Sequence, residues 1–245
     1  MTSRRILRLT GTDLDTFLKG LVTNDVAELG QGLVYAALLT PQGKYIADFF
    51  LLRDEAGGVL LDVDETLADM LIKRLSMYKL RADVTIADSG LNLQRGTGDA
   101  PADALSDPRH ADMGWRAYST APASDDTSNW DAIRVAHCIP ETGIELTADS
   151  FILEAGFETL QGVDFRKGCY VGQEVTARMK HKATLRKGLR IVSVEGSVPV
   201  GSQITAEGKA VGTLFTQSGG RGIAYLRLDR TAAGMVADGV NVRLT

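Results

Sequence analysis

The residues best suited to chemistry lie together in one short stretch around a cysteine. It reads Arg166-Lys167-Gly168-Cys169-Tyr170-Val171-Gly172-Gln173-Glu174. A cysteine reacts as the thiolate, and neighbouring Lys or Arg side chains or a helix N-terminus favour that form. Two cations precede Cys169, and a helix is predicted over residues 173–180, so the stretch predicts a reactive thiol on a tight loop. A buried structural cysteine in an ordinary turn is the alternative.

Two glycines and a charged pair around Cys169 indicate a place for a ligand. Gly168 and Gly172 permit turns that other residues resist, and they let a ligand approach the main chain. Glu174 and Arg178 are four residues apart, which places them on the same face of a helix. They form either a minor surface ion pair or a ligand site in which Glu174 accepts N–H groups and Arg178 binds a carboxylate.

The run Lys-Gly-Cys-Tyr-Val-Gly-Gln-Glu at residues 167–174 resembles the signature of the YgfZ-type folate-binding proteins. These proteins support iron–sulfur cluster assembly and are related to the aminomethyltransferase of the glycine cleavage system. The chain is similar to that family in three further segments, residues 10–26, 38–44 and 134–140. Cys138 stands in the last of them where the family usually has glycine.

The resemblance implies a tetrahydrofolate cofactor, with iron–sulfur assembly proteins or their client enzymes as partners. Folate carries both groups that Glu174 and Arg178 would bind, because its pterin has N–H donors and its glutamyl tail is anionic. The implied catalytic residues are Cys169, Lys167 and Asp48, and Lys167 is expected to favour the thiolate of Cys169. The implied folate-binding residues are Asn24, Tyr170, Gly172, Gln173, Glu174 and Arg178.

Two other functions stay open. The first is a folate-dependent one-carbon (aminomethyl-type) transferase in which Cys169 or Asp48 takes part. Aminomethyltransferases carry paired acids where this chain has Ala47-Asp48, so the resemblance favours an accessory protein in [4Fe-4S] cluster assembly or repair. The second is an RNA-associated protein. Aromatic residues are not interleaved with the basic run as base stacking requires, so we expect an indirect link through tRNA-modifying iron–sulfur enzymes and no direct nucleic-acid binding.

Charge is unevenly distributed along the chain. The formal net charge is −4 over 245 residues, yet residues 166–190 hold eight Lys or Arg and one acid, which leaves −11 on the remainder. A basic segment on an acidic protein indicates a local anionic ligand rather than general binding of polyanions. A solvated surface is the alternative.

Composition also bounds the location of the protein. No run approaches the roughly 18 apolar residues of a membrane span, and the N-terminus lacks the apolar core of a secretory signal. Two cysteines without paired spacing indicate a reducing compartment. Three histidines and two cysteines argue against a protein-only zinc site. We therefore expect a cytoplasmic protein with no membrane contact and no metal site.

Apolar periodicity predicts the elements that must position Cys169. The first 87 residues predict a strand, a helix, three strands, a helix and a strand, close to a ferredoxin-like unit with an extra strand. Residues 96–112 are polar and predict a long surface loop. Short, evenly spaced strands after residue 187 predict a small barrel. We expect an α+β, aminomethyltransferase-like folate-binding fold with ferredoxin-like units plus a C-terminal β-barrel, divided into residues 1–184 and 185–245.

Overall fold

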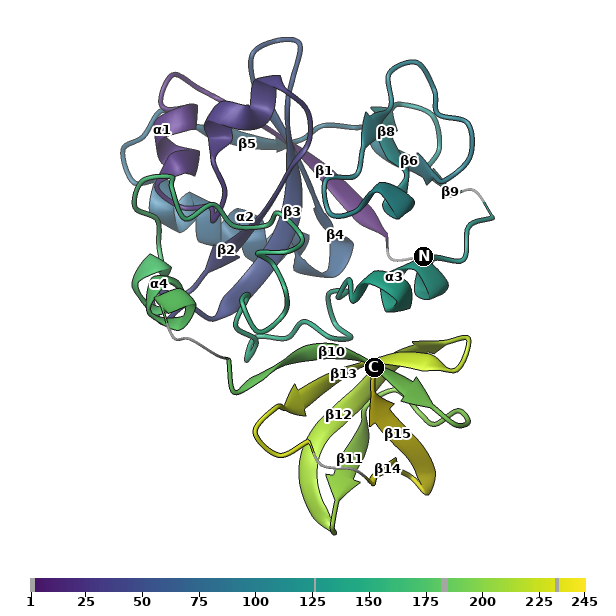
Figure 1. Ribbon diagram of the computed structural model, residues 1–245. Helices are drawn as coiled ribbons and strands as arrows, with labels where there is room; N and C mark the ends of the chain where they lie inside the picture. Colours follow the sequence, from purple (N-terminus) through teal and green to yellow (C-terminus); the bar gives the residue numbers. More distant parts are fainter. Residues whose placement is uncertain (1–2, 126, 182–184, 232–233) are drawn as a thin grey trace. The chain divides into compact units, whose positions relative to one another are not determined.

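The computed structural model describes the whole chain except residues 1–2, 126, 182–184 and 232–233. The described residues form two compact units, and most of their helices and strands are labelled in Figure 1. The first unit contains residues 1–128 and 158–175, and the second contains residues 129–157 and 176–245. The domain boundary predicted between residues 184 and 185 stays a prediction.

A five-stranded antiparallel sheet in the order β2-β3-β4-β1-β5 forms the centre of the first unit. Its strands are β1 (Arg4–Thr10), β2 (Val34–Leu39), β3 (Tyr45–Arg53), β4 (Val59–Asp64) and β5 (Thr85–Asp88). The helical segments of this part are α1 (Leu14–Lys19), η1 (Val26–Gly30) and α2 (Glu65–Lys79). The order of strands and helices agrees with the predicted one, and the α+β class is confirmed.

The two faces of this sheet have different chemistry. Side chains alternate between faces along a strand, so Ala47 and Phe49 of β3 join a hydrophobic core with Leu18 of α1 and Leu71 of α2. Asp48, which lies between Ala47 and Phe49, points to the opposite face. That face is polar and aromatic, and it is the one on which the candidate site residues of β2 and β3 gather.

A buried ion network joins the polar face to a second, four-stranded sheet in the order β7-β8-β6-β9. Arg116 Nη2 lies 2.5 Å and Arg4 Nε 2.6 Å from the carboxylate of Asp62, which also accepts a hydrogen bond from Tyr118. Burial by itself would raise the pKa of Asp62, but Arg116 and Arg4 lower it to about 2. The second sheet comprises β6 (Asn92–Gly96), β7 (Leu105–Ser106), β8 (Trp115–Ser119) and β9 (Ser124–Asp125).

The prediction of a long surface loop over residues 96–112 is wrong for its second half. Asp107 is 3% exposed and pairs with Arg109 at 2.7 Å. The Arg109 guanidinium lies over the rings of Phe50 and Tyr35, at 4.8 and 5.5 Å from their centroids. Polar composition indicated exposure, but these charges are buried because they neutralise one another and pack on aromatic rings. The 3-10 helix η2 (Ala111–Met113) follows directly.

The second unit contains a closed six-stranded barrel in the order β10-β13-β12-β11-β14-β15, which confirms the predicted barrel. Its strands are β10 (Lys187–Val194), β11 (Ser202–Ala206), β12 (Lys209–Ser218), β13 (Arg221–Arg227), β14 (Met235–Ala237) and β15 (Val240–Leu244). Val192, Ile204 and Leu214 are among the side chains that fill its core. No helix in the described part of the chain is both long and apolar enough to span a bilayer.

The remaining helices are α3 (Trp130–His137) and α4 (Gln173–His181). Arg134 of α3 is buried, and its Nη2 lies 2.5 Å from the Glu145 carboxylate. Thr216 of β12 donates to the other oxygen of Glu145 at 2.6 Å. This network ties α3 to the barrel within the second unit, which explains why an arginine is buried in the segment that resembles the family.

Candidate functional site: the Cys169 loop

The loop that carries Cys169 lies along the segment that follows α1. We call residues 163–172 the signature loop. The Asp164 amide donates to the Thr23 carbonyl at 3.1 Å, and the Val171 amide donates to the Gly20 carbonyl at 3.2 Å. These contacts lie on either side of Cys169, so its loop is fixed at both ends although the thiol itself is exposed.

Lys167 anchors the middle of the signature loop. Its side chain is buried, and Nζ donates to the carbonyls of Lys19 and Val22 at 2.7 and 2.6 Å. The ammonium group also lies 4.9 Å from the centroid of the Tyr170 ring. Burial lowers the pKa of Lys167 to about 8, against the opposing effect of Asp25. The direct partners of this lysine are therefore backbone carbonyls at the end of α1, an anchoring role that the sequence did not predict.

Gly172 closes the loop against the β2–β3 turn. Its φ is +84°, and a Cβ atom added there would lie 2.5 Å from the Thr40 carbonyl oxygen. Gly43, in the same turn, has a φ of +74° and would bring a Cβ to 2.9 Å from Val175. The close approach predicted for the Gly172 backbone is therefore made here to the β2–β3 turn of the protein itself.

We expect Gly172→Ala to lower the free energy of unfolding by about 2 to 3 kcal/mol, because strain at positive φ adds to a backbone clash. Urea denaturation measures this change. The matched control is Gly57→Ala, which has a φ of +86° and open space around the added Cβ. It should cost only about 1 kcal/mol. Equal losses for the two variants would show that the contact with Thr40 adds nothing.

The two cysteines have different surroundings. Cys169 is exposed, whereas Cys138 is partly buried and forms the C-cap of α3 in a left-handed conformation, with φ 54°. Burial raises the pKa of the Cys138 thiol to about 11. Helices often end with glycine in this conformation, so the turn is kept although cysteine replaces the family's usual glycine. Of the two thiols, Cys169 is the one accessible to a partner.

A cavity of about 220 Å³ opens beside the start of the signature loop. We call it the Asn24 pocket. All of its walls belong to the first unit. Its lining residues are Asn24, Glu28, Leu33, Val34, Tyr35, Pro108, Glu158, Gln161, Val163, Asp164 and Arg166. Three carboxylates and one guanidinium line this pocket, so it suits a ligand with both N–H donors and an anionic group.

Asn24 builds the wall of this pocket rather than reaching into it. Its Nδ2 donates to the carbonyls of Tyr35 and Gln161, at 2.8 and 2.7 Å. Gln161 has a φ of +54°, an uncommon conformation for a residue other than glycine. The two hydrogen bonds occupy both N–H groups of Asn24. The sequence pattern did not single out the pocket acids Glu158 and Asp164, although both lie within the nine residues before Lys167.

Asp48 lies beneath the pocket wall. It is 5% exposed and accepts hydrogen bonds from the hydroxyls of Tyr35 and Tyr45, at 2.9 and 2.5 Å. Burial and the neighbouring Asp48 carboxylate raise the pKa of Tyr35 well above its usual value. The carboxylate therefore holds the Tyr35 side chain in place from the polar face of the sheet.

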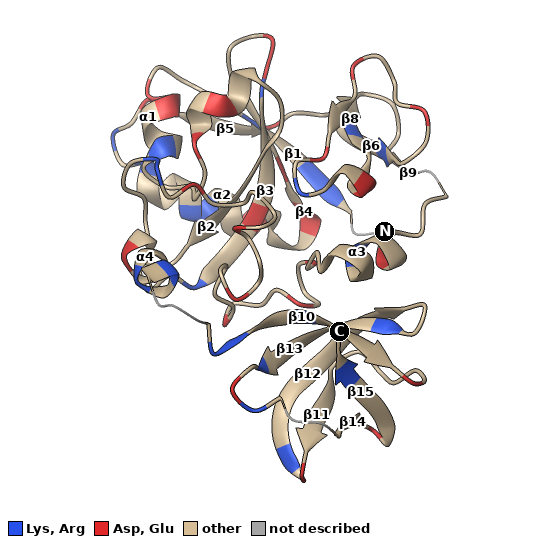
Figure 2. Cartoon of the chain, in the orientation of Figure 1, with Lys and Arg blue, Asp and Glu red and all other residues tan. Residues whose placement is uncertain are grey.

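The other predicted folate-binding residues lie at the far end of the signature loop. Tyr170 is buried, while Gln173 and Glu174 begin α4 and Arg178 lies in its last turn. Figure 2 shows acidic and basic residues together on this helix. None of these four residues lines the Asn24 pocket. Within the first unit, Asn24 thus lines the pocket beside the start of the signature loop, while Tyr170, Gly172, Gln173 and Glu174 lie at or just after its end.

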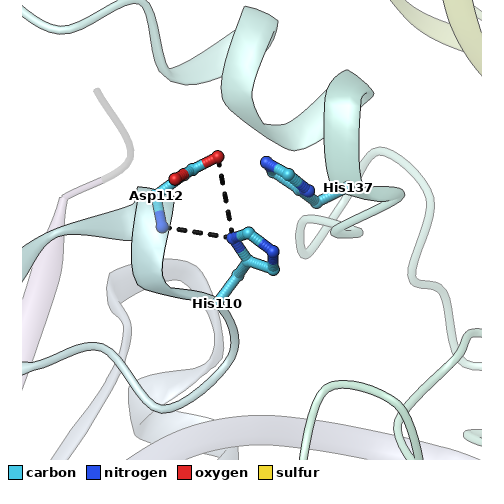
Figure 3. A group of neighbouring side chains, drawn as sticks. All are labelled: His110, Asp112 and His137. Carbon is cyan, nitrogen blue, oxygen red and sulfur yellow. Dashed lines mark hydrogen bonds and ion pairs between the residues drawn. The ribbon is translucent and has the colours of Figure 1, made fainter.

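His110 and Asp112 form a local polar pair in the first unit, shown in Figure 3. His110 Nδ1 accepts a hydrogen bond from the Asp112 amide at 3.1 Å and lies 3.9 Å from the Asp112 carboxylate. His137, drawn in the same figure, belongs to α3 of the second unit. We assign no metal site to these three residues.

Comparison with known proteins defines the class of this fold. A family model described as the C-terminal β-barrel domain of CAF17 matches residues 186–245. The whole structure is similar to the glycine cleavage system aminomethyltransferase T from Bartonella henselae, with a TM-score of 0.76 and 12% identity over 99% of this chain and 83% of that one. The protein therefore has the aminomethyltransferase fold with its C-terminal barrel, as predicted.

Sequence comparison then gives the family. The chain is 32% identical to the mitochondrial iron–sulfur cluster assembly factor IBA57 of Mus musculus, over 93% of this chain and 76% of that protein. It is 31% identical to the corresponding Homo sapiens protein, over 92% of this chain and 76% of that protein. The chain belongs to the family of IBA57 iron–sulfur cluster assembly factors.

These relatives correct one expectation from the sequence and leave a second one unconfirmed. A cytoplasmic location was predicted from cysteine usage and the absence of a signal, but the relatives are named as mitochondrial proteins. A reducing compartment is not unique to the cytoplasm, which is why cysteine content gave the wrong answer. The comparisons support the IBA57 family and do not confirm the more specific YgfZ-type assignment.

Proposed function

We propose that this protein acts as an accessory factor in the assembly or repair of [4Fe-4S] clusters and that Cys169 is its functional group. The observation that carries the proposal is an exposed thiol on a loop held by backbone hydrogen bonds on either side and by buried Lys167. The family relationship supports it, since the relatives are named iron–sulfur cluster assembly factors.

The thiol suits iron–sulfur chemistry for a simple reason. A thiolate is a soft ligand that binds iron and zinc well, and a rigid loop presents it without an entropic cost of ordering at the moment of contact. The cluster is cargo in this proposal. The Cys169 thiol would bind it transiently while it is transferred from an assembly protein or to a client enzyme. Client enzymes that modify tRNA would then depend on the protein indirectly.

We further propose that tetrahydrofolate binds at the Asn24 pocket. The cavity of about 220 Å³ is smaller than most sites for drug-sized ligands, so it suits the pterin ring with the tail outside. Carboxylates such as Glu158 would accept the pterin N–H groups, and exposed Arg166 would pair with the glutamyl tail. Glu174 and Arg178 of α4 remain candidates for the same groups.

Calorimetric titration with tetrahydrofolate tests this binding. We expect saturable binding to wild type and a loss of at least about tenfold in affinity for Glu158→Gln, because one charged hydrogen bond is worth roughly 1.5 to 3 kcal/mol. Glu207→Gln is the control, since Glu207 is an exposed acid in the barrel. Absence of heat and of any thermal shift with reduced folates would remove folate from the proposal and leave the thiol function standing.

A folate-dependent one-carbon transferase is the second candidate, and the surroundings of Asp48 argue against it. Its carboxylate is buried and engaged by two tyrosine hydroxyls, which leaves it poorly placed to exchange protons with a substrate. Turnover of a methylene or aminomethyl folate donor by the purified protein, lost in Asp48→Asn, would restore the transferase. We expect no such turnover.

A further inference from the structure

The C-terminal end of α2 exposes two large apolar side chains. Leu80 is 87% exposed and Met77 is 61% exposed, and the other exposed large hydrophobic residues in the described part of the chain are Val200 at 61% and Leu244 at 46%. Met77 lies in the last turn of α2, and Leu80 is the residue that caps the helix, so the two exposed side chains mark its C-terminal end. An exposed apolar pair of this kind marks a candidate contact surface.

Leu80 also occupies a backbone position that disfavours it. Its φ and ψ are 46° and −101°, and the Ala82 amide donates to the Lys79 carbonyl at 2.7 Å. Together these describe a type II′ turn with Leu80 at its second position, where glycine is normally required. The chain thus keeps a bulky apolar residue where the backbone prefers none and where little of its side chain is buried. The fold gives no reason for a leucine here.

Cations surround this pair. Residues 70–82 contain Lys73, Arg74, Lys79 and Arg81 but no acid, and basic segments are drawn blue in Figure 2. None of the four forms an ion pair with another described residue. The nearby Asp83 accepts hydrogen bonds from Thr12. The helix dipole explains a cation at the C-terminus of α2, but it does not explain an exposed leucine and methionine beside it.

We propose that the end of α2 is a docking surface for a partner protein that presents an apolar hollow ringed by Asp and Glu side chains. The α2-end surface consists of Lys73, Arg74, Met77, Lys79, Leu80 and Arg81. Interfaces combine an apolar centre with a polar rim, which this surface reproduces. Because the chain is acidic overall, an acidic partner is attracted to such basic surfaces and repelled elsewhere, which orients the encounter.

A protein fits this surface better than a lipid bilayer does. Helices that lie on membranes present a long apolar face. The apolar face of α2 is buried in the core through Ala68, Leu71 and Leu75, so only Met77 and Leu80 remain for contact. Two side chains with four cations suit a small pocket on an acidic protein surface.

Photo-crosslinking from position 80 tests the proposal in cells. The variant Leu80→p-benzoylphenylalanine should give one dominant protein adduct, whose crosslinked peptide lies in a surface rich in Asp and Glu. The adduct should disappear in the background Lys79→Glu/Arg81→Glu and persist in Cys169→Ala. Leu244→p-benzoylphenylalanine is the control, since Leu244 is an exposed leucine of the barrel.

Three outcomes would overturn the proposal. One is an adduct no stronger than at position 244, and the second is a protein adduct that survives charge reversal. The third is a lipid adduct, together with binding of the purified protein to vesicles that contain anionic lipid. None of these outcomes bears on the thiol function, which is measured separately by enzyme activity.

A stability measurement separates docking from folding. We expect Leu80→Gly to keep or raise the melting temperature, by roughly 2 °C, because glycine relieves the strained turn. The same variant should weaken binding of the crosslinked partner, once purified, by about tenfold, as loss of a central apolar contact does. Leu80→Met should keep that binding. A lower melting temperature for Leu80→Gly, or unchanged affinity, would show that the leucine serves its own fold.

Discussion

Cys169→Ala is expected to fold as stably as wild type and to lose all support of [4Fe-4S] enzymes. The side chain is exposed, so its removal leaves no cavity in the core. The backbone contacts of the loop, from Asp164 to Val171, do not involve the thiol. Function should nevertheless disappear, because alanine cannot act as a nucleophile or as a soft ligand to iron. The assay is the activity of a [4Fe-4S] enzyme in cells that lack the native protein.

The other cysteine provides the matched control for this experiment. Cys138→Gly removes a thiol from a position with φ 54°, where glycine is favoured, so it should keep both stability and function. Cys169→Ala should also retain affinity for tetrahydrofolate, since Cys169 does not line the Asn24 pocket. Full complementation by Cys169→Ala would show that this thiol is dispensable and that the protein works through another group.

Lys167→Met is expected to reduce the free energy of unfolding by about 4 kcal/mol, because it leaves two buried carbonyls without their donor. The lost hydrogen bonds are those to Lys19 and Val22. Cellular function should fall with it, since the loop that presents Cys169 loses its central anchor. Urea denaturation gives the stability change, and Lys209→Met, at an exposed position in the barrel, is the control. A variant of unchanged stability but reduced function would instead support the original expectation that Lys167 acts on the thiolate.

The stability that Lys167 contributes should also depend on pH. Its pKa in the folded protein is about 8, below the roughly 10.4 of an unfolded lysine. Between these values the unfolded chain binds more protons, so the free energy of unfolding contributed by this residue rises with pH. A neutral amine keeps two N–H donors for its two carbonyls. The stability difference between wild type and Lys167→Met should therefore widen from pH 8 to about 10, and a narrowing difference would mean that the carbonyls raise the pKa instead.

The sequence alone determined the elements of this protein and the position of its reactive loop. Apolar periodicity predicted the strands and helices around the first sheet, and evenly spaced turns predicted the closed barrel from Lys187 onward. A cysteine between two glycines, followed by a helix start at Gln173, predicted a thiol on a loop. These features are local, because periodicity and turn chemistry depend on residues within a few positions of one another.

Only the tertiary structure decided what the individual polar residues do. Lys167 binds carbonyls 145 and 148 residues away, and Asn24 holds a carbonyl 137 residues away. Asp107 belongs to a polar stretch that predicts a surface loop, yet its carboxylate is buried against Arg109 and Arg116. Such partners cannot be read from neighbouring residues, since a polar side chain is buried only where the fold supplies the group that satisfies it. The fold therefore decided which polar residues build the site and left Cys169 as the exposed thiol.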